Sequence, residues 1–103
     1  MKILIWGTGK LAARYMKFDY FVGHEIIGFV DSYKKDAQFM EYKIYSPQDI
    51  GALEYEYLVV CVARENDIIL ENCIEKGVDL KKVFFAVRRL DLKNVAQSYV
   101  EQL

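Results

Sequence analysis

Apolar residues along this chain fall into two kinds of stretch: short continuous runs, and longer segments in which they recur every three or four positions. The continuous runs are rich in β-branched and aromatic residues and predict strands covered on both faces of a sheet. The predicted strands are residues Lys2–Trp6, Glu25–Asp31, Tyr42–Tyr45, Tyr57–Ala63 and Val83–Val87. The third is the shortest of these, so we expect it at an edge of the sheet.

The segments with helical spacing lie between these strands. In the first segment Leu11, Tyr15 and Phe18 form an apolar stripe, which predicts a helix. Gly23 and Gly77 follow two of the segments at positions where glycine commonly ends a helix. We predict helices over residues Lys10–Val22, Pro47–Leu53, 64–76 and Leu92–Leu103. Ser32–Glu41 is a polar connector, long enough for a loop or a single helical turn.

The alternation of strands and helices predicts one α/β domain with a doubly wound parallel sheet. Right-handed crossovers give the order 3-2-1-4-5 when the strands are numbered along the chain. At 103 residues the chain is too short for a second hydrophobic core, and we interpret residues 88–103 as a C-terminal helix that can connect to a further domain. The strand order reverses between the first and fourth strands, where ligands of such sheets bind.

A glycine turn follows the first strand directly. Gly7, Thr8 and Gly9, with Ala12 three positions later, fit the G-x-G-x-x-G/A spacing of phosphate-binding turns. Small residues let the backbone approach a phosphate, and the helix that starts at Lys10 and Leu11 presents free N–H groups to it. The turn therefore predicts a site for a phosphate-bearing ligand, although a tight turn needs glycine even without a ligand.

Asp31 ends the second strand 24 residues after Gly7, close to the usual spacing of about 20 residues for the carboxylate that binds a ribose. We expect Asp31 and Ser32 near a ribose or base. The alternative is that Asp31 only caps the turn that follows it, in a scaffold whose pocket holds no ligand.

Ala63 ends the fourth strand and Arg64 begins the helix that follows, next to the predicted turn across the switch point. Arg64 can clamp a pyrophosphate or a carboxylate. The equally favoured alternative is an exposed arginine that pairs with Glu65 or Asp67.

The formal net charge of −1 predicts that neither nucleic acid nor a membrane surface is a partner, and it favours a small molecule. A protein partner would be a second copy of the chain or a companion catalytic domain. Cys61 and Cys73 lie in apolar patterns and are interpreted as core thiols of a protein in a reducing compartment. With no apolar stretch long enough for a secretion signal or a bilayer span, we expect a cytoplasmic protein.

Several reactions lack the residues they need. There is no Tyr-x-x-x-Lys pair, the turn lacks the length and the Lys-Ser/Thr of a P-loop, and no acidic residue precedes the glycines as in many methyltransferases. His24, the only histidine, lies at the amino end of the second strand, away from the predicted site. We predict no catalytic residue and no metal site, and a chain that is not a complete enzyme by itself.

The order of segments Ile-Leu-Ile-Trp-Gly-Thr-Gly-Lys-Leu-Ala, Ile-Ile-Gly-Phe-Val-Asp-Ser, Tyr-Lys-Ile-Tyr-Ser-Pro-Gln-Asp-Ile and Tyr-Glu-Tyr-Leu-Val-Val-Cys-Val resembles a known group. It is similar, up to about Val87, to the small Rossmann-like domains of bacterial enzymes of surface-polysaccharide metabolism. These domains include the N-terminal domains of sugar acyltransferases with a left-handed β-helix. Others stand beside sugar epimerases, methyltransferases and glycosyltransferases.

The resemblance implies a domain that binds NAD or a UDP-sugar for a sugar-modifying transferase or epimerase. It places Gly7 to Lys10 near phosphate and Asp31 or Ser32 near ribose or base. Glu41 stands where the group often has a glycine, which is a departure from its pattern. Two alternatives stay open: an interaction or dimerisation module with an empty pocket, and a fragment of a small NAD-dependent oxidoreductase or epimerase.

Overall fold

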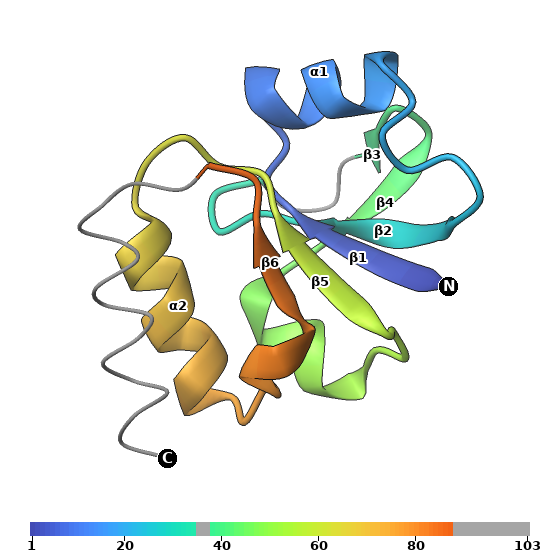
Figure 1. Ribbon diagram of the computed structural model, residues 1–103. Coiled ribbons are helices and arrows are strands. Elements are labelled where there is room, and N and C mark those ends of the chain that lie inside the picture. The colour runs from blue at the N-terminus through green and yellow to red at the C-terminus, as the bar shows by residue number, and fades with distance from the viewer. Residues whose placement is uncertain (35–37, 88–103) are drawn as a thin grey trace.

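A computed structural model describes residues 1–34 and 38–87 of the chain (Figure 1). The predicted helix over Leu92–Leu103 lies outside the described residues. In chain order the elements are β1 (Lys2–Trp6), α1 (Lys10–Lys17), β2 (Glu25–Val30), β3 (Gln38–Phe39), β4 (Tyr42–Tyr45), the 3-10 helix η1 (Pro47–Ala52), β5 (Tyr57–Val60), α2 (Asn66–Glu75), the 3-10 helix η2 (Leu80–Lys82) and β6 (Val83–Phe85). No helix among the described residues is both long and apolar enough to cross a membrane.

The strands form one six-stranded sheet in the order β3-β4-β2-β1-β5-β6. Neighbouring strands from β4 to β6 run parallel, and only β3 is antiparallel to its neighbour. The predicted fold class and the relative order of the five predicted strands are confirmed. The prediction of about five strands missed β3, which forms inside the segment Ser32–Glu41 that was expected to be a loop or a single helical turn. Because β3 pairs with β4, the expectation that Tyr42–Tyr45 lies at an edge of the sheet was wrong.

The unexpected β3 pairs with β4 through a two-residue turn at Met40 and Glu41. Both turn residues have positive φ, 50° and 74°, as a type I′ hairpin turn requires. Such turns usually carry Asn-Gly, so the sequence gives no signal for this one. Phe29 of β2 stabilises the hairpin, since its ring centroid lies 4.8 Å from that of Phe39 and 5.8 Å from that of Tyr42.

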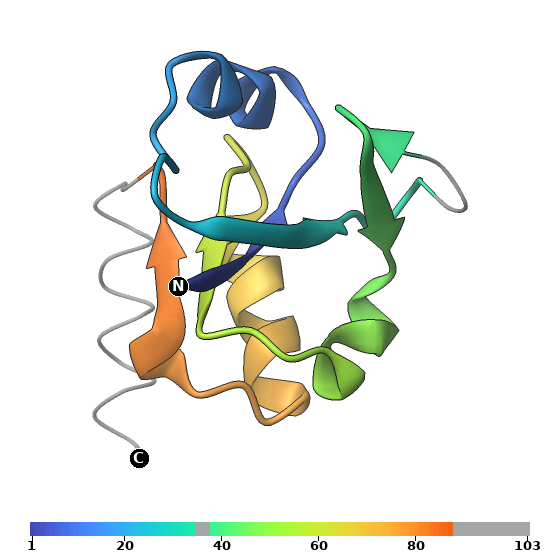
Figure 2. The same ribbon diagram turned by 90° about the vertical axis from the view of Figure 1, so that its right-hand side faces the viewer.

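Helices cover both faces of the sheet, with α1 on one face and α2 and η1 on the other (Figures 1 and 2). Successive residues of β1 point to opposite faces, as expected for a strand. Ile5 packs in the cluster that contains Ala12 of α1, whereas Trp6 packs in the cluster that contains Ile69 of α2. Trp6 therefore belongs to the α2 face and stands at the carboxyl end of the central strand.

The first helix ends at Lys17, five residues before the predicted end at Val22. Asp19 adopts a left-handed conformation with φ of 56°, and the N–H of Tyr20 donates to the carbonyl of Tyr15 at 3.2 Å. This bond pattern is a Schellman cap, and it is accompanied by contact between the rings of Tyr15 and Tyr20, whose centroids lie 4.6 Å apart. Asp19 thus adopts the left-handed conformation that glycine usually provides after a helix. The prediction used Gly23 to mark the end of the helix and therefore placed that end too late.

The second helix ends as predicted, because Gly77 follows it with φ of 71°. Three predicted strands are longer than the observed β2, β5 and β6, which end at Val30, Val60 and Phe85. After β5 and β6 the apolar run continues past the last paired residue into the turn that leaves the sheet, whereas the residue predicted in excess for β2 is Asp31. The predicted helix behind Ser46 forms as the 3-10 helix η1, held by a hydrogen bond of 3.0 Å from the Ser46 N–H to the Asp49 carboxylate.

Replacing Asp19 with glycine is expected to raise the free energy of unfolding by about 0.5–1 kcal/mol, because a left-handed conformation costs most residues about 1–2 kcal/mol and glycine almost nothing. Urea denaturation measures the change. The reciprocal control is Gly77→Asp, at the matching position after α2, where a Cβ meets no atom within 4 Å. That variant should lose stability. Equal stability of Asp19→Gly and the parent would contradict this account of why α1 ends at Lys17.

Candidate functional site

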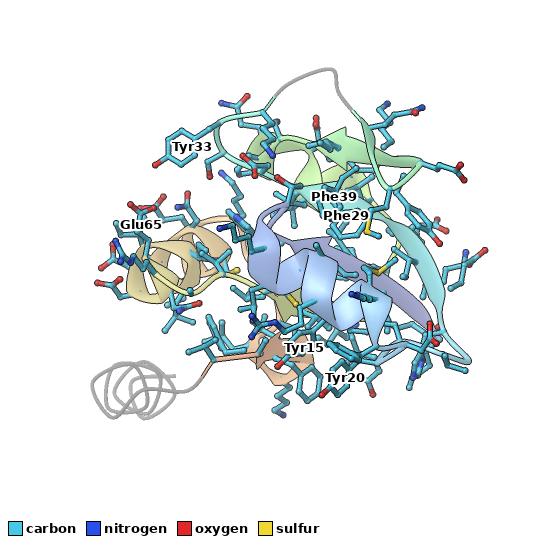
Figure 3. The ribbon with its side chains drawn as sticks, turned by 90° about the horizontal axis from the view of Figure 1, so that it is seen from above. Tyr15, Tyr20, Phe29, Tyr33, Phe39 and Glu65 are labelled. Carbon is cyan, nitrogen blue, oxygen red and sulfur yellow. The ribbon has the colours of Figure 1, made fainter. Side chains whose placement is uncertain are left out.

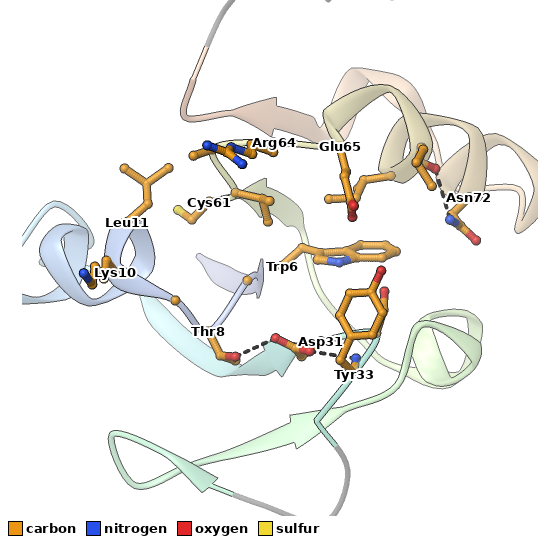
Figure 4. A pocket seen from close by; sticks show the side chains of 17 residues that line it. Trp6, Thr8, Lys10, Leu11, Asp31, Tyr33, Cys61, Arg64, Glu65 and Asn72 are labelled. Atoms are coloured by element: carbon orange, nitrogen blue, oxygen red, sulfur yellow. Dashed lines mark hydrogen bonds between the residues drawn. The ribbon is translucent and has the colours of Figure 1, made fainter.

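A cavity of about 420 Å³ opens at the carboxyl ends of β1, β2 and β5, where the strand order reverses (Figure 4). Its volume lies in the range of about 300–1,000 Å³ that is usual for small-molecule sites. The structure brings all nine predicted site residues to its wall: Gly7, Thr8, Gly9, Lys10, Leu11, Asp31, Ser32, Ala63 and Arg64. That these residues bind a ligand stays a prediction.

Gly7 is required by the fold itself. A Cβ at this position would lie 2.4 Å from the carbonyl oxygen of Cys61, and φ is +123°. The N–H of Gly7 donates to the carbonyl of Val30 at 2.8 Å. The turn is therefore held between β2 and β5 whether or not a ligand is present.

Gly9 has a different environment. A Cβ there would meet no atom within 4 Å, and φ of −96° is an ordinary value for any residue. Gly9 precedes α1 without a capping side chain, and the N–H groups of Lys10 and Leu11 find no acceptor within residues 1–34 and 38–87. The start of α1 therefore presents unpaired donors and the positive end of the helix dipole to the cavity.

Asp31 is held by three hydrogen bonds. Its Oδ2 accepts from the Thr8 hydroxyl at 2.6 Å, and its Oδ1 accepts from the N–H groups of Tyr33 at 2.8 Å and Lys34 at 3.0 Å. Burial raises the pKa of Asp31, but these bonds and the nearby Lys34 ammonium outweigh burial and hold the pKa below its usual value. Asp31 is thus ionised at neutral pH and does cap the turn after β2, as the alternative interpretation predicts.

A second link joins the same two segments. The Lys34 ammonium donates to the carbonyl of Thr8 at 3.4 Å. Together with the bond between Thr8 and Asp31, it fixes the loop after β2 against the glycine turn. A ligand that inserts between them must exchange one of these bonds for its own.

Two cations border the cavity from different elements, Lys10 at the start of α1 and Arg64 after β5. Neither side chain makes a hydrogen bond or an ion pair within the part of the chain that the structure describes, so the predicted pairing of Arg64 with Glu65 or Asp67 is not formed there. Glu65 has a left-handed backbone with φ of 61° immediately before α2. Figure 4 shows its side chain directed toward the indole of Trp6.

Several lining residues were not predicted from the sequence. Trp6 is 2% exposed, and its indole N–H makes no hydrogen bond within the described residues. Figure 4 shows the nitrogen edge of that ring turned toward Asp31 and Tyr33. Tyr33 is 83% exposed and stands with Glu65 on one side of the molecule (Figure 3). The remaining unpredicted residues are Cys61, Val62, Ile68, Ile69 and Asn72.

A signal for these residues does exist in the sequence. Glu65, Ile68, Ile69 and Asn72 recur with helical spacing, which places them on one face of a helix that begins at the site. Side chains alternate between the two faces along β1, so Trp6, like Leu4, lies on the sheet face that α2 covers.

The cysteines behave as core thiols, as predicted. Both are free and buried, and burial raises the pKa of Cys61 to about 12 and that of Cys73 to about 11, although Lys76 lowers the latter slightly. Neither thiol is a nucleophile at neutral pH. The described residues contain no group of three or more His, Cys, Asp or Glu side chains that could hold a metal ion.

The fold and the cavity define a small Rossmann-like domain. Residues 1–84 match the family of C2185-like N-terminal domains, and the chain belongs to that family. A search of curated proteins found no match to the sequence.

Solved structures that share the fold include two of the protein RSP. A crystal structure of RSP in complex with β-NAD+ and operator DNA has a TM-score of 0.57 and 15% identity, over 98% of this chain and 56% of that one. A crystal structure of RSP, described as a Rex-family repressor, has a TM-score of 0.55 and 15% identity, over 98% and 58% of the respective chains. The chain thus spans less than two thirds of the repressor.

These structures correct the prediction that nucleic acid is not a partner. The prediction relied on the net charge of −1, yet a protein with this fold is found in complex with operator DNA. A formal net charge of −1 therefore does not exclude nucleic acid as a partner of this fold.

The hydrogen bonds to Asp31 predict a pH dependence of stability. Because the folded state holds the pKa of Asp31 below the usual 3.8, the carboxylate stabilises the fold above that pH, and the contribution is lost as pH falls through the folded pKa. The difference in unfolding free energy between the parent and Asp31→Asn should therefore be largest at neutral pH and shrink in acid. Urea denaturation at a series of pH values measures it.

Thr8→Val is the companion variant, because it removes the shortest of the three hydrogen bonds while keeping the volume of the buried side chain. The pKa of Asp31, followed by NMR of its carboxyl carbon, should rise in this variant. A pKa that does not move would show that Thr8 does not stabilise the carboxylate.

Proposed function

We propose that this domain binds NAD(H), with the ligand phosphates at the glycine turn and a ribose beside Asp31 and Ser32. The observation that carries the proposal is the meeting of three strand ends, which surround one cavity with unpaired donors and cations. The bound NAD+ of one solved structure with the same fold supports the choice of ligand.

The phosphate side of the cavity has the chemistry that a pyrophosphate needs. The first-turn N–H groups of α1 lack acceptors, and Gly9 leaves open space in front of them. Lys10 at the start of α1 and Arg64 after β5 add two unpaired cations. Backbone donors at a helix start together with basic side chains are a common way to bind phosphate.

The ribose side is built around an ionised carboxylate. A negative Asp31 can accept a hydrogen bond from a ribose hydroxyl and disfavours a phosphate on the same ribose, which favours NAD(H) over NADP(H). Lys34 acts in the opposite direction, but its ammonium is engaged with the Thr8 carbonyl. The indole of Trp6 adds an apolar surface and one unpaired N–H donor for the ligand.

We place no catalytic residue in this cavity, and we propose that the domain supplies dinucleotide binding to a larger assembly. The crystal structure of RSP, in complex with both β-NAD+ and operator DNA, is an example of such an assembly. None of the comparisons supports a sugar-modifying role or a UDP-sugar ligand.

Trp6 makes the test direct, because it is the only tryptophan in the chain and lines the cavity. When NADH is titrated in, excitation of Trp6 should produce nicotinamide emission by energy transfer, with saturation. NAD+ should compete and abolish the transfer, whereas UDP-glucose should not. Absence of saturable transfer would overturn the proposal, and competition by UDP-glucose alone would redirect it to nucleotide sugars.

Gly9→Ala tests the position of the phosphate. The added methyl group meets no protein atom, so the fold should be kept, but it occupies the space in front of the α1 N–H groups. NADH affinity should fall at least about tenfold, equivalent to about 1.4 kcal/mol. The matched control is Gly51→Ala, the same change at an open glycine outside the cavity, which should bind as the parent does. Unchanged affinity in Gly9→Ala would rule out phosphate at the turn.

A further inference from the structure

A second cavity of about 620 Å³ adjoins the first, on the α2 face of the sheet. One wall comes from β4 and the start of η1, and the other from the second half of α2. Ser32 and Asn72 line both cavities, so the two hollows are neighbours that share a boundary. We call this second hollow the lysine groove, after Lys43 and Lys76 on its two walls.

The charges of the lysine groove are unbalanced. Lys43 and Lys76 contribute two cations, and neither makes an ion pair or a hydrogen bond within the described residues. The Lys43 ammonium lies 4.9 Å from the ring centroid of Tyr45, which holds the charge over the sheet and leaves its N–H donors unused. Asp49 is the one acidic residue of the lining among the described residues, and its Oδ2 already accepts from the N–H and hydroxyl of Ser46.

Neutral donors complete the lining. The Ser32 hydroxyl and the Gln48 amide make no hydrogen bond within residues 1–34 and 38–87, and both residues line the groove. Asn72 uses one N–H of its amide to donate to the carbonyl of Ile68 at 3.0 Å, and a second N–H is left. Two cations and several neutral donors around a hollow favour a compact group with several acceptor oxygens.

We propose that the lysine groove binds a phosphate group, between Lys43 on β4 and Lys76 at the end of α2. The phosphate has two sources: a free phosphate or phosphomonoester, or a phosphate carried by a nucleotide in the first cavity. The ionised Asp31 disfavours a phosphate on the adjoining ribose, so the free source is favoured. The site does not depend on the proposed binding of NAD(H), since inorganic phosphate can be tested alone.

The experiment is a titration of isotope-labelled protein followed by amide NMR at constant ionic strength, with chloride as the reference anion. Inorganic phosphate should shift the resonances of Ser32, Ser46, Gln48 and Asn72 with saturation. If the nucleotide carries the phosphate, NADP+ should shift the resonances of Ser46 and Gln48, which line the lysine groove and not the first cavity, and NAD+ should not. Absence of saturable shifts at these residues with both inorganic phosphate and NADP+ would overturn the proposal.

Variants of the two lysines test the placement. The double variant Lys43→Gln, Lys76→Gln should bind the phosphate source at least about tenfold more weakly, whereas Lys43→Arg, Lys76→Arg should retain binding because it keeps both charges. Lys17→Gln removes an exposed lysine outside both cavities and should bind as the parent does. Equal affinity of the double glutamine variant and the parent would overturn the proposal. The energy transfer from Trp6 to NADH reports separately on the first cavity.

Discussion

The backbone at Gly7 passes so close to the carbonyl of Cys61 that no side chain fits between them. This approach, together with the hydrogen bond from Gly7 to Val30, holds the carboxyl ends of β1, β2 and β5 together. Asp31 is the next residue after Val30, and Arg64 follows Cys61 by three positions, so both reach the same hollow. The position of the candidate site is thus a consequence of close packing between strands. The polar and charged side chains proposed to contact a ligand surround a turn that the fold requires in any case.

Much of the fold could be predicted because its signals are local. Continuous apolar runs placed the five parallel strands, and Gly77 placed the end of α2. The errors occurred at Asp19 and at the Met40–Glu41 turn, where residues with a Cβ adopt left-handed conformations. Packing of Tyr20 on Tyr15 and of Phe39 on Phe29 stabilises those conformations, and such contacts cannot be seen in a local stretch of sequence.

The same distinction holds for the site. A linear motif was enough to predict that Gly9 and Asp31 line the same cavity, because the turn and the strand end have a characteristic spacing in this fold. The contribution of Trp6 required knowledge of which sheet face it occupies, and that of Tyr33 required the path of the loop after β2. No linear motif could predict the lysine groove, since its walls come from β4 and α2 and meet only in the folded chain.

The hydrogen bonds of Asp31 also bear on how a sugar would be distinguished. Oδ1 already accepts from two backbone N–H groups, so only Oδ2 has room for a further donor beside Thr8. A carboxylate in this state can bind one hydroxyl of a ribose and not the pair. Its preference for ribose over 2′-deoxyribose would then depend on which single hydroxyl it meets, and the loop after β2 sets that choice through the backbone of Tyr33 and Lys34.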